Sequence, residues 1–153
     1  MASIQHILVA LDFSESSRLA LEYAELLARQ FGAAVDLVHV VTPLVPPMPA
    51  GCAPPFFSNP GEAHLVEARA CLENHADELR SRGLSVATLL LEGSPLESIL
   101  GQAQKRHCDL LVLGTHGRSG MAHMLLGSVA EKILRMAPCP VLTVRHPSFN
   151  HKG

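Results

Sequence analysis

The fold is decided by residues 109–145, DLLVLGTHGRSGMAHMLLGSVAEKILRMAPCPVLTVR. Residues 110–113 form an apolar run that is too short for a buried helix and therefore predicts a strand. The segment GTHGRSG follows, with a glycine at every third position; Gly127 and Ser128 then precede a helical pattern and a second apolar run. This order is typical of phosphate-binding α/β proteins, because a glycine-rich loop and a helix start both offer backbone N–H groups to an anion.

Strands alternate with helices along the rest of the chain. Strands joined through helices are parallel and have right-handed crossovers, so five of them most simply form an α/β fold. We expect a single open five-stranded parallel sheet, in the order 3-2-1-4-5, with helices on both faces. The expected strands are the apolar runs at residues 4–11, 35–41, 85–91, 109–114 and 141–144.

Caps and apolar periodicity predict four helices. The first is expected between Ser14 and Gly32, and the second between Asn59-Pro60 and Gly83. The sequences SPLE (94–97) and SVAE (128–131) are capping boxes that start the third and fourth. The apolar residues that recur at helical spacing are Leu19, Tyr23, Leu26 and Leu27; Leu65, Ala68, Leu72, Ala76 and Leu79; Ile99, Leu100 and Ala103; and, facing inward, Val129, Ile133 and Met136.

The predicted strand order reverses direction between the first and fourth strands. Ligands bind at such a point, in the crevice outside the carboxyl ends of the strands. Three strand ends meet there: residues 10–12, Val40-Val41 and Leu113-Gly114. Because the glycine-rich loop begins at Gly114, the topology itself predicts a ligand site at this crevice.

Composition sets the class of protein. The 153 residues suit one domain, expected at 1–146, with a proline-rich loop at 42–60 that holds seven of the eleven prolines and a polar tail at 147–153. A net charge of −2 without a basic cluster argues against nucleic acid as a partner. No apolar run approaches the ~20 residues of a membrane helix, and no signal peptide is recognisable. The four cysteines lack C-x-x-C spacing, so reduced thiols and a cytoplasmic location are expected.

Two common nucleotide motifs are missing. The first strand ends in Ala10-Leu11-Asp12 instead of G-x-G-x-x-G, and no Walker run G-x-x-x-x-G-K-[S/T] occurs. The nine histidines show no metal-ligand spacing. We expect His39 to be a satisfied polar group in a buried strand and His116 to be the one histidine that touches a ligand.

What the chain does contain is Gly114-x-x-Gly117, nine further residues and Gly127-Ser128. This spacing, together with ILVALDFSESS near the start and GTHGRSGMAHMLLGSVAEKILRMAPCPVLTV near the end, resembles the universal stress protein family over essentially the whole chain. The resemblance implies a Rossmann-like fold of the adenine nucleotide alpha hydrolase type. It also implies ATP as ligand, because every glycine and the serine of the ATP-binding subgroup are present, and a homodimer in a stress-response setting.

The resemblance also implies a set of binding residues. Asp12 and its neighbour would lie near the adenosine, the end of the second strand would offer backbone groups to adenine, and the glycine-rich segments would hold ribose and phosphates. The residues concerned are Ala10, Asp12, Val40, Val41, Leu113, Gly114, His116, Gly117, Gly127, Ser128 and Val129. Arg118, the one fixed cation of the loop, is a further candidate for binding phosphate.

Each of these residues also has a simpler interpretation. The glycines Gly114 and Gly117 alternatively permit turns with positive φ. Ser128 alternatively caps the last helix with Glu131, and Asp12 is alternatively a cap or a solvated carboxylate. Arg118 alternatively pins the loop, and the three valines are core residues in any case.

The sequence leaves three hypotheses for function. Phosphoryl transfer commonly needs a lysine and bound Mg²⁺; the loop has no lysine, and Asp12 is the one carboxylate placed to hold the metal. We therefore name no catalytic residue and expect an ATP-binding regulator or sensor with slow or no hydrolysis. The alternatives are a weak Mg-dependent ATPase and a dimeric interaction module with a vestigial nucleotide site.

The last strand predicts self-association. It is an edge strand in the order 3-2-1-4-5, and only the proline at its start protects its apolar residues. Pairing with a second copy across a two-fold axis would cover that edge. The sequence therefore predicts a homodimer through Val141, Leu142, Thr143 and Val144.

Overall fold

A computed structural model describes residues 2–43, 60–116 and 126–147 of the chain. Its five strands form one parallel sheet in the order β3-β2-β1-β4-β5, which confirms the predicted topology. The strand ends agree with the predicted ranges to within two residues. The strands are β1 (His6–Ala10), β2 (Ala34–Val41), β3 (Val86–Glu92), β4 (Leu110–Gly114) and β5 (Val141–Val144).

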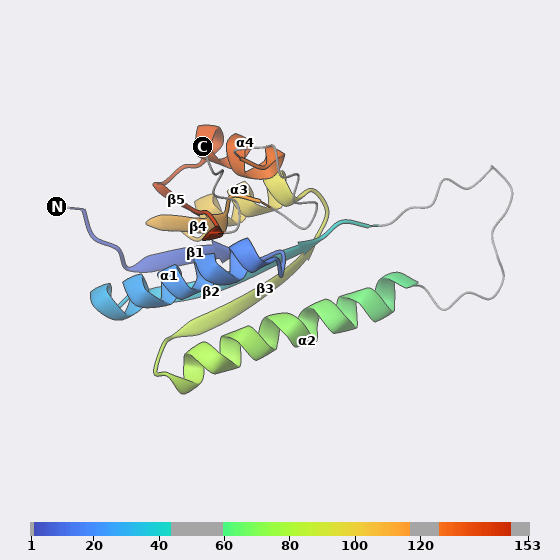
Figure 1. Ribbon diagram of the computed structural model, residues 1–153, viewed down its shortest axis with the longest axis horizontal. Coiled ribbons are helices and arrows are strands. Elements are labelled where there is room, and N and C mark those ends of the chain that lie inside the picture. Colours follow the sequence, from blue (N-terminus) through green and yellow to red (C-terminus); the bar gives the residue numbers. More distant parts are fainter. Residues whose placement is uncertain (1, 44–59, 117–125, 148–153) are drawn as a thin grey trace, which may run out of the picture.

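Four helices cover the two faces of the sheet (Figure 1). Helices α1 (Glu15–Phe31) and α2 (Pro60–Ser81) lie on one face, and α3 (Pro95–Lys105) and α4 (Ser128–Met136) lie on the other. Alternate residues of each inner strand enter different cores: in β1, Ile7 packs beneath α1 and α2, whereas Leu8 packs beneath α3 and α4. Burial on both faces explains why the strands read as continuous apolar runs. No helix in the described residues is long and apolar enough to cross a membrane.

The ends of α1 confirm the predicted caps. Ser14 Oγ accepts a hydrogen bond from the Ser17 N–H at 3.2 Å, which satisfies one of the free donors of the first turn. At the other end Gly32 adopts a left-handed conformation, with φ 67°, and its N–H donates to the Ala28 carbonyl. The start of α1 is therefore held in a defined position beside the carboxyl end of β1.

The two predicted capping boxes are wrong. Ser94 does precede α3, but its side chain makes no capping hydrogen bond. In α4 the capping position belongs to Gly127, so Ser128 is the first helical residue, and the Glu131 carboxylate pairs with Arg135 instead of turning back. The helix starts one residue earlier than the pattern suggests because the Gly127 carbonyl already accepts the Glu131 N–H, at 2.9 Å, as the first hydrogen bond of the helix.

The buried face of α1 is made of small residues. Ala20, Ala24 and Ala28 are fully buried, whereas Tyr23 is 47% and Leu26 62% exposed. Small side chains let a helix approach a sheet closely. The predicted apolar stripe of α1 is confirmed in part, since Leu19 and Leu27 pack against the core whereas Tyr23 and Leu26 lie outside it. The inward placement predicted for Met136 in α4 is also wrong, because Ala130 and Ile133 form the buried face and Met136 is 62% exposed.

The thiols of the α3–α4 face are core groups. Burial raises the pKa of the Cys108 thiol to about 12 and also raises the pKa of Cys139. A thiol that stays protonated at neutral pH is a poor nucleophile. Both residues pack with the apolar core beneath α3 and α4.

Candidate nucleotide site

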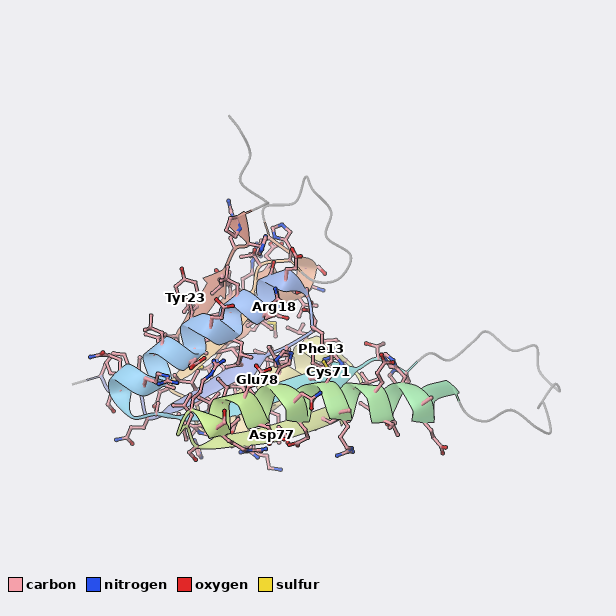
Figure 2. All side chains as sticks on the ribbon, turned by 60° about the horizontal axis from the view of Figure 1, so that its bottom comes forward. Phe13, Arg18, Tyr23, Cys71, Asp77 and Glu78 are labelled. Atoms are coloured by element: carbon pink, nitrogen blue, oxygen red, sulfur yellow. The ribbon has the colours of Figure 1, made fainter. Side chains whose placement is uncertain are left out.

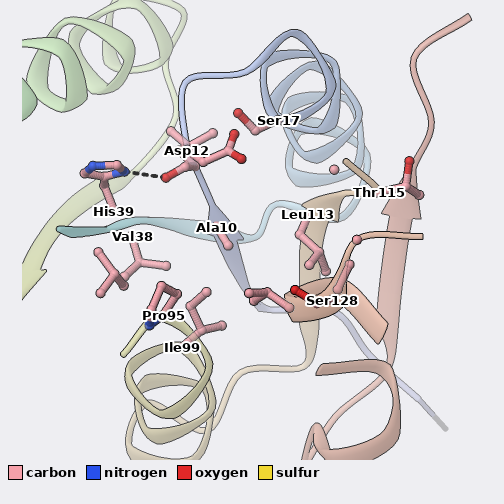
Figure 3. Close-up of a pocket in the computed structure, with 16 residues that line it drawn as sticks. Ala10, Asp12, Ser17, Val38, His39, Pro95, Ile99, Leu113, Thr115 and Ser128 are labelled. Carbon is pink, nitrogen blue, oxygen red and sulfur yellow. Dashed lines mark hydrogen bonds between the residues drawn. The ribbon is translucent and has the colours of Figure 1, made fainter. Parts of the chain in front are cut away.

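A pocket of about 230 Å³ lies where β1, β2 and β4 end and where α3 and α4 begin. Asp12 and Ser17 lie on one side of it, and Pro95 and Ile99 lie on the opposite side (Figure 3). This is the crevice that the strand order predicts. The residues that line it are Ala10, Leu11, Asp12, Ser17, Val38, His39, Val40, Pro95, Ile99, Leu113, Gly114, Thr115, Gly127, Ser128, Val129 and Ala130.

Asp12 is held in the turn that joins β1 to α1. Its Oδ1 accepts the Ser14 N–H at 2.9 Å, two residues along the chain, which is the hydrogen bond of an Asx turn. In the described residues no hydrogen bond is made to Asp12 Oδ2. The helix cap is Ser14, so the interpretation of Asp12 as the cap is wrong. The half-buried carboxylate therefore presents one oxygen that is available to a bound molecule.

His39 forms part of the wall supplied by β2. Its ring is buried, and its Nδ1–H donates to the Leu11 carbonyl at 2.6 Å, the dashed line in Figure 3. This hydrogen bond confirms the prediction of a satisfied polar group in a buried strand. Val38 and Val40 on either side of it make the wall mainly apolar.

Gly114 ends β4 directly against the start of α1. A Cβ at this position would lie 2.7 Å from Ser16 Cβ and 2.8 Å from both Ser16 C and Ser17 N. Its φ is not in the positive range, so the interpretation of Gly114 as a turn residue is wrong. Glycine is required here because two segments of backbone touch, and this contact closes one side of the pocket.

The start of α4 closes the other side. The hydrogen bond from the Gly127 N–H to the Thr115 carbonyl brings the helix start to the end of β4. Ser128, at the first helical position, is exposed and lines the pocket. Free backbone N–H groups and the helix dipole at this end favour an anionic group.

Eight of the twelve residues predicted to bind ligand line the pocket: Ala10, Asp12, Val40, Leu113, Gly114, Gly127, Ser128 and Val129. Two others are buried outside it. The Val41 carbonyl accepts the Gly93 N–H at 3.0 Å. His116 Nδ1 lies 2.9 Å from Thr115 Oγ1, and the His116 carbonyl accepts the Ser14 hydroxyl. Gly117 and Arg118 lie outside the described residues.

Sequence reasoning missed the contribution of α3 and of His39. Pro95 and Ile99 enter the pocket because they belong to α3, the helix that connects β3 to β4 and crosses the sheet beside the crevice. That signal was present in the predicted strand order, since a right-handed connection between those strands runs across β2 and β1. The other lining residues that were not assigned are Leu11, Ser17, Val38, Thr115 and Ala130.

The side chains around the pocket suit a metal ion only if a bound ligand supplies further atoms to coordinate it. Within the described ranges no group of three His, Cys, Asp or Glu side chains lies close enough to hold an ion. Asp12 is the one carboxylate that lines the pocket as described. Mg²⁺ is commonly held by one or two carboxylates together with substrate phosphates, so Asp12 fits a cation that arrives with a phosphate group.

The chain matches known proteins over most of its length. The model of the universal stress protein family matches residues 3–145. A universal stress protein of Methanocaldococcus jannaschii, MJ0531, is 36% identical over 149 residues, which cover 92% of this chain and 82% of the relative. The universal stress protein YxiE of Bacillus subtilis is 32% identical, over 91% of this chain and 97% of the relative.

Solved structures share the fold. The structure of MJ0577, a protein of Methanocaldococcus jannaschii, superimposes with a TM-score of 0.77 at 27% identity and covers 93% of this chain and 96% of its own. A universal stress protein in complex with cAMP has a TM-score of 0.69 at 26% identity, over 94% of this chain and 98% of its own. Matched in sequence from the first strand to the last, and in structure around the same sheet, this chain belongs to the universal stress protein family.

Proposed function

We propose that this protein binds ATP in the pocket and acts as a stress-response regulator or sensor with slow or no hydrolysis. The observation that carries the proposal is the pairing of an available Asp12 carboxylate oxygen with the start of α4 across one largely apolar pocket. A nucleotide has the matching parts: an apolar base, ribose hydroxyls that donate hydrogen bonds, and an anionic end. The cAMP complex of a structural relative supports an adenine nucleotide as the class of ligand.

The pocket suggests how the nucleotide would lie. Val38, Val40 and Ile99 offer an apolar slot for the adenine ring. The Asp12 carboxylate is placed to accept ribose hydroxyls, and the start of α4 at Gly127-Ser128 is placed to receive phosphates. Alternatively, Asp12 would be the protein ligand of a Mg²⁺ ion bound to the phosphates, in place of its contact with the ribose.

Slow turnover follows from the charges around the pocket. Phosphoryl transfer is accelerated mainly by cations that stabilise the transferred group and by a residue that orients the nucleophile. Among the described lining residues there is no lysine or arginine, and the two buried polar side chains nearest the end of β4, Thr115 and His116, interact with each other. A pocket lined in this way suits the binding of a nucleotide better than its hydrolysis.

Titration calorimetry with Mg-ATP tests the site. We expect one nucleotide per chain in protein freed of bound nucleotide, and we expect Asp12→Ala to weaken binding by roughly tenfold or more, because hydrogen bonds to a charged group contribute about 1.5–3 kcal/mol. Glu15→Ala is the matched control, since it removes an exposed carboxylate three residues away that does not line the pocket. Absence of heat and of a thermal shift with ATP, ADP, AMP and cAMP would refute the proposal. Rapid single-turnover hydrolysis that depends on Asp12 would establish an ATPase instead.

We also propose that two chains pair through β5. The flanking surface supports this, because Leu134 and Met136 of α4 are exposed, as is Tyr23, on the side of α1 that faces away from α2 (Figure 2). Apolar surface on both sides of an exposed sheet edge favours an additional strand from a second copy. Helix α1 also contacts β5, so the exposed residues of α1 adjoin that edge.

The Thr143→Pro variant should be monomeric. The Pro140 and Val144 carbonyls accept hydrogen bonds from β4, so by alternation the Thr143 N–H points away from β4, toward the open edge. Proline removes this donor and leaves the β4 pairing groups in place. Light scattering at micromolar concentration should give a dimer mass for the wild type and for the control Thr143→Val, which keeps the N–H. A wild-type monomer would contradict the proposal.

A further inference from the structure

Phe13 adopts a conformation that is unusual for its residue type. Its φ is 63°, in the left-handed region, where a bulky side chain normally clashes with the backbone. In the described part of the chain only one other non-glycine residue, His107, has a positive φ. Strained residues persist where their surroundings hold them, and they concentrate at functional sites. Phe13 directly follows Asp12, at the edge of the pocket.

Two histidine rings hold the Phe13 ring. His39 of β2 lies with its ring centroid 4.3 Å from that of Phe13, at an interplanar angle of 32°, and His75 of α2 stacks on it at 6.1 Å and 18°. Figure 2 shows Phe13 in the space between the start of α1 and the middle of α2, beside Cys71. Three aromatic rings from a loop, a strand and a helix therefore form one stack.

The stack is connected to Asp12 on both sides of the turn. On one side, the His39 ring donates to the carbonyl of Leu11; on the other, the Ser14 N–H donates to Asp12 Oδ1. Phe13 lies between these two hydrogen bonds. Leu11, Asp12 and His39 all line the pocket, whereas Phe13 does not.

We propose that Phe13 is a positioning residue whose ring, held between His39 and His75, fixes the strained turn that directs the Asp12 carboxylate into the pocket. It acts on ligand through Asp12 and does not touch the ligand. A ring is needed, because an aliphatic side chain of similar bulk fills space without the stacking that offsets the strained backbone. The consequence for nucleotide rests on the proposed binding function.

A double-mutant cycle tests this mechanism. Phe13→Leu removes the ring and keeps apolar bulk, and we expect it to weaken Mg-ATP binding by roughly three- to tenfold, the size of an aromatic pair interaction. Phe13→Tyr, which keeps the ring, should bind as the wild type does. In an Asp12→Ala background, Phe13→Leu should have no further effect, because the group through which it acts is already gone. Equal effects in both backgrounds would overturn the inference.

Helix α2 provides a second pair of variants. His75→Leu removes the outer ring of the stack and should weaken Mg-ATP binding in the same direction as Phe13→Leu. His64→Leu, a matched change at an exposed position of the same helix, should leave affinity unchanged. Equal affinities of the two variants would show that the outer ring does not position the turn.

Amide hydrogen exchange gives a readout without nucleotide. In nucleotide-free protein, exchange of the Ser14 amide should be faster in Phe13→Leu than in the wild type and unchanged in Phe13→Tyr, because this amide is the donor to Asp12. A variant with a lower Tm but unchanged Ser14 exchange would show that Phe13 only fills space, which overturns the inference. Faster Ser14 exchange in a protein that binds no nucleotide would instead refute the proposed function and leave the role of Phe13 in the turn standing.

Discussion

Gly114→Ala should destabilise the protein by about 3 kcal/mol, because the added methyl group has no space. The atoms it would meet include the Ser16 backbone carbon and the Ser17 backbone nitrogen, both at 2.8 Å. Both serines are only 2% exposed, at the start of α1, so relief requires the helix to move away from β4. Urea unfolding should show a lower midpoint with an unchanged slope.

Gly101→Ala is the matched control for this prediction. Gly101 lies at an exposed position of α3, and a Cβ built on it meets nothing within 4 Å. Alanine is a better helix former than glycine, so this variant should be more stable by about 0.5–1 kcal/mol. The same chemical change is therefore expected to have opposite signs at the two positions. Equal stabilities of Gly114→Ala and the wild type would show that α1 does not press on β4 as described.

Displacement of α1 by Gly114→Ala should also change the geometry of the pocket. The start of this helix carries Ser17, which lines the pocket, and Ser14, whose N–H binds Asp12. We therefore expect weaker Mg-ATP binding in any folded fraction of the variant. The glycine acts through packing, which differs from the phosphate contact that its place in a glycine-rich segment suggests.

Asp36→Ala should destabilise the protein by about 3–5 kcal/mol, the usual cost of removing one partner of a buried ion pair. The Asp36 side chain is 3% exposed in the middle of the sheet. Its Oδ2 lies 2.7 Å from His6 Nε2 and 2.8 Å from Arg106 Nη1. The variant leaves Arg106 partly buried without the carboxylate that pairs with it, and thermal and urea unfolding measure the loss.

An exposed pair provides the control for Asp36. Asp77 Oδ1 lies 2.8 Å from Arg80 Nη1 on α2, and both side chains are exposed to solvent. Because exposed ion pairs are screened by solvent, Asp77→Ala should change the free energy of unfolding by less than about 0.5 kcal/mol. Similar losses in the two variants would contradict the assignment of Asp36 as a buried structural charge.

Local patterns were sufficient for the architecture. The strands and helices, the order of the sheet and the position of the crevice follow from apolar periodicity, caps and the handedness of crossovers. These rules act within one element or between neighbouring elements, so a linear sequence displays them. The individual binding residues came from the resemblance to the family; eight of the twelve line one pocket, at the ends of predicted strands or at the start of a predicted helix.

The same patterns failed where the outcome depends on what lies opposite a residue. Large apolar side chains in α1 suggest a buried face, but the alanines pack on the sheet and Tyr23 stays outside. His116 has a place in the glycine-rich segment that suggests ligand contact, but its neighbours are Thr115 and Ser14. His39, which reads as a core residue, lines the pocket.

Three residues show most clearly what depends on folding. In the sequence Asp36 is a single charged residue in an apolar strand; in the structure it pairs with His6 of β1 and with Arg106 at the end of α3. Phe13 is an ordinary apolar residue until β2 and α2 supply the rings that hold its strained turn. In the sequence Gly114 is part of a phosphate-loop pattern; in the structure the start of α1 lies where a side chain at this position would be. Periodicity specifies which elements form, because it is a property of neighbouring residues; the role of a single side chain depends on contacts between residues far apart in the chain, which exist only after the elements pack.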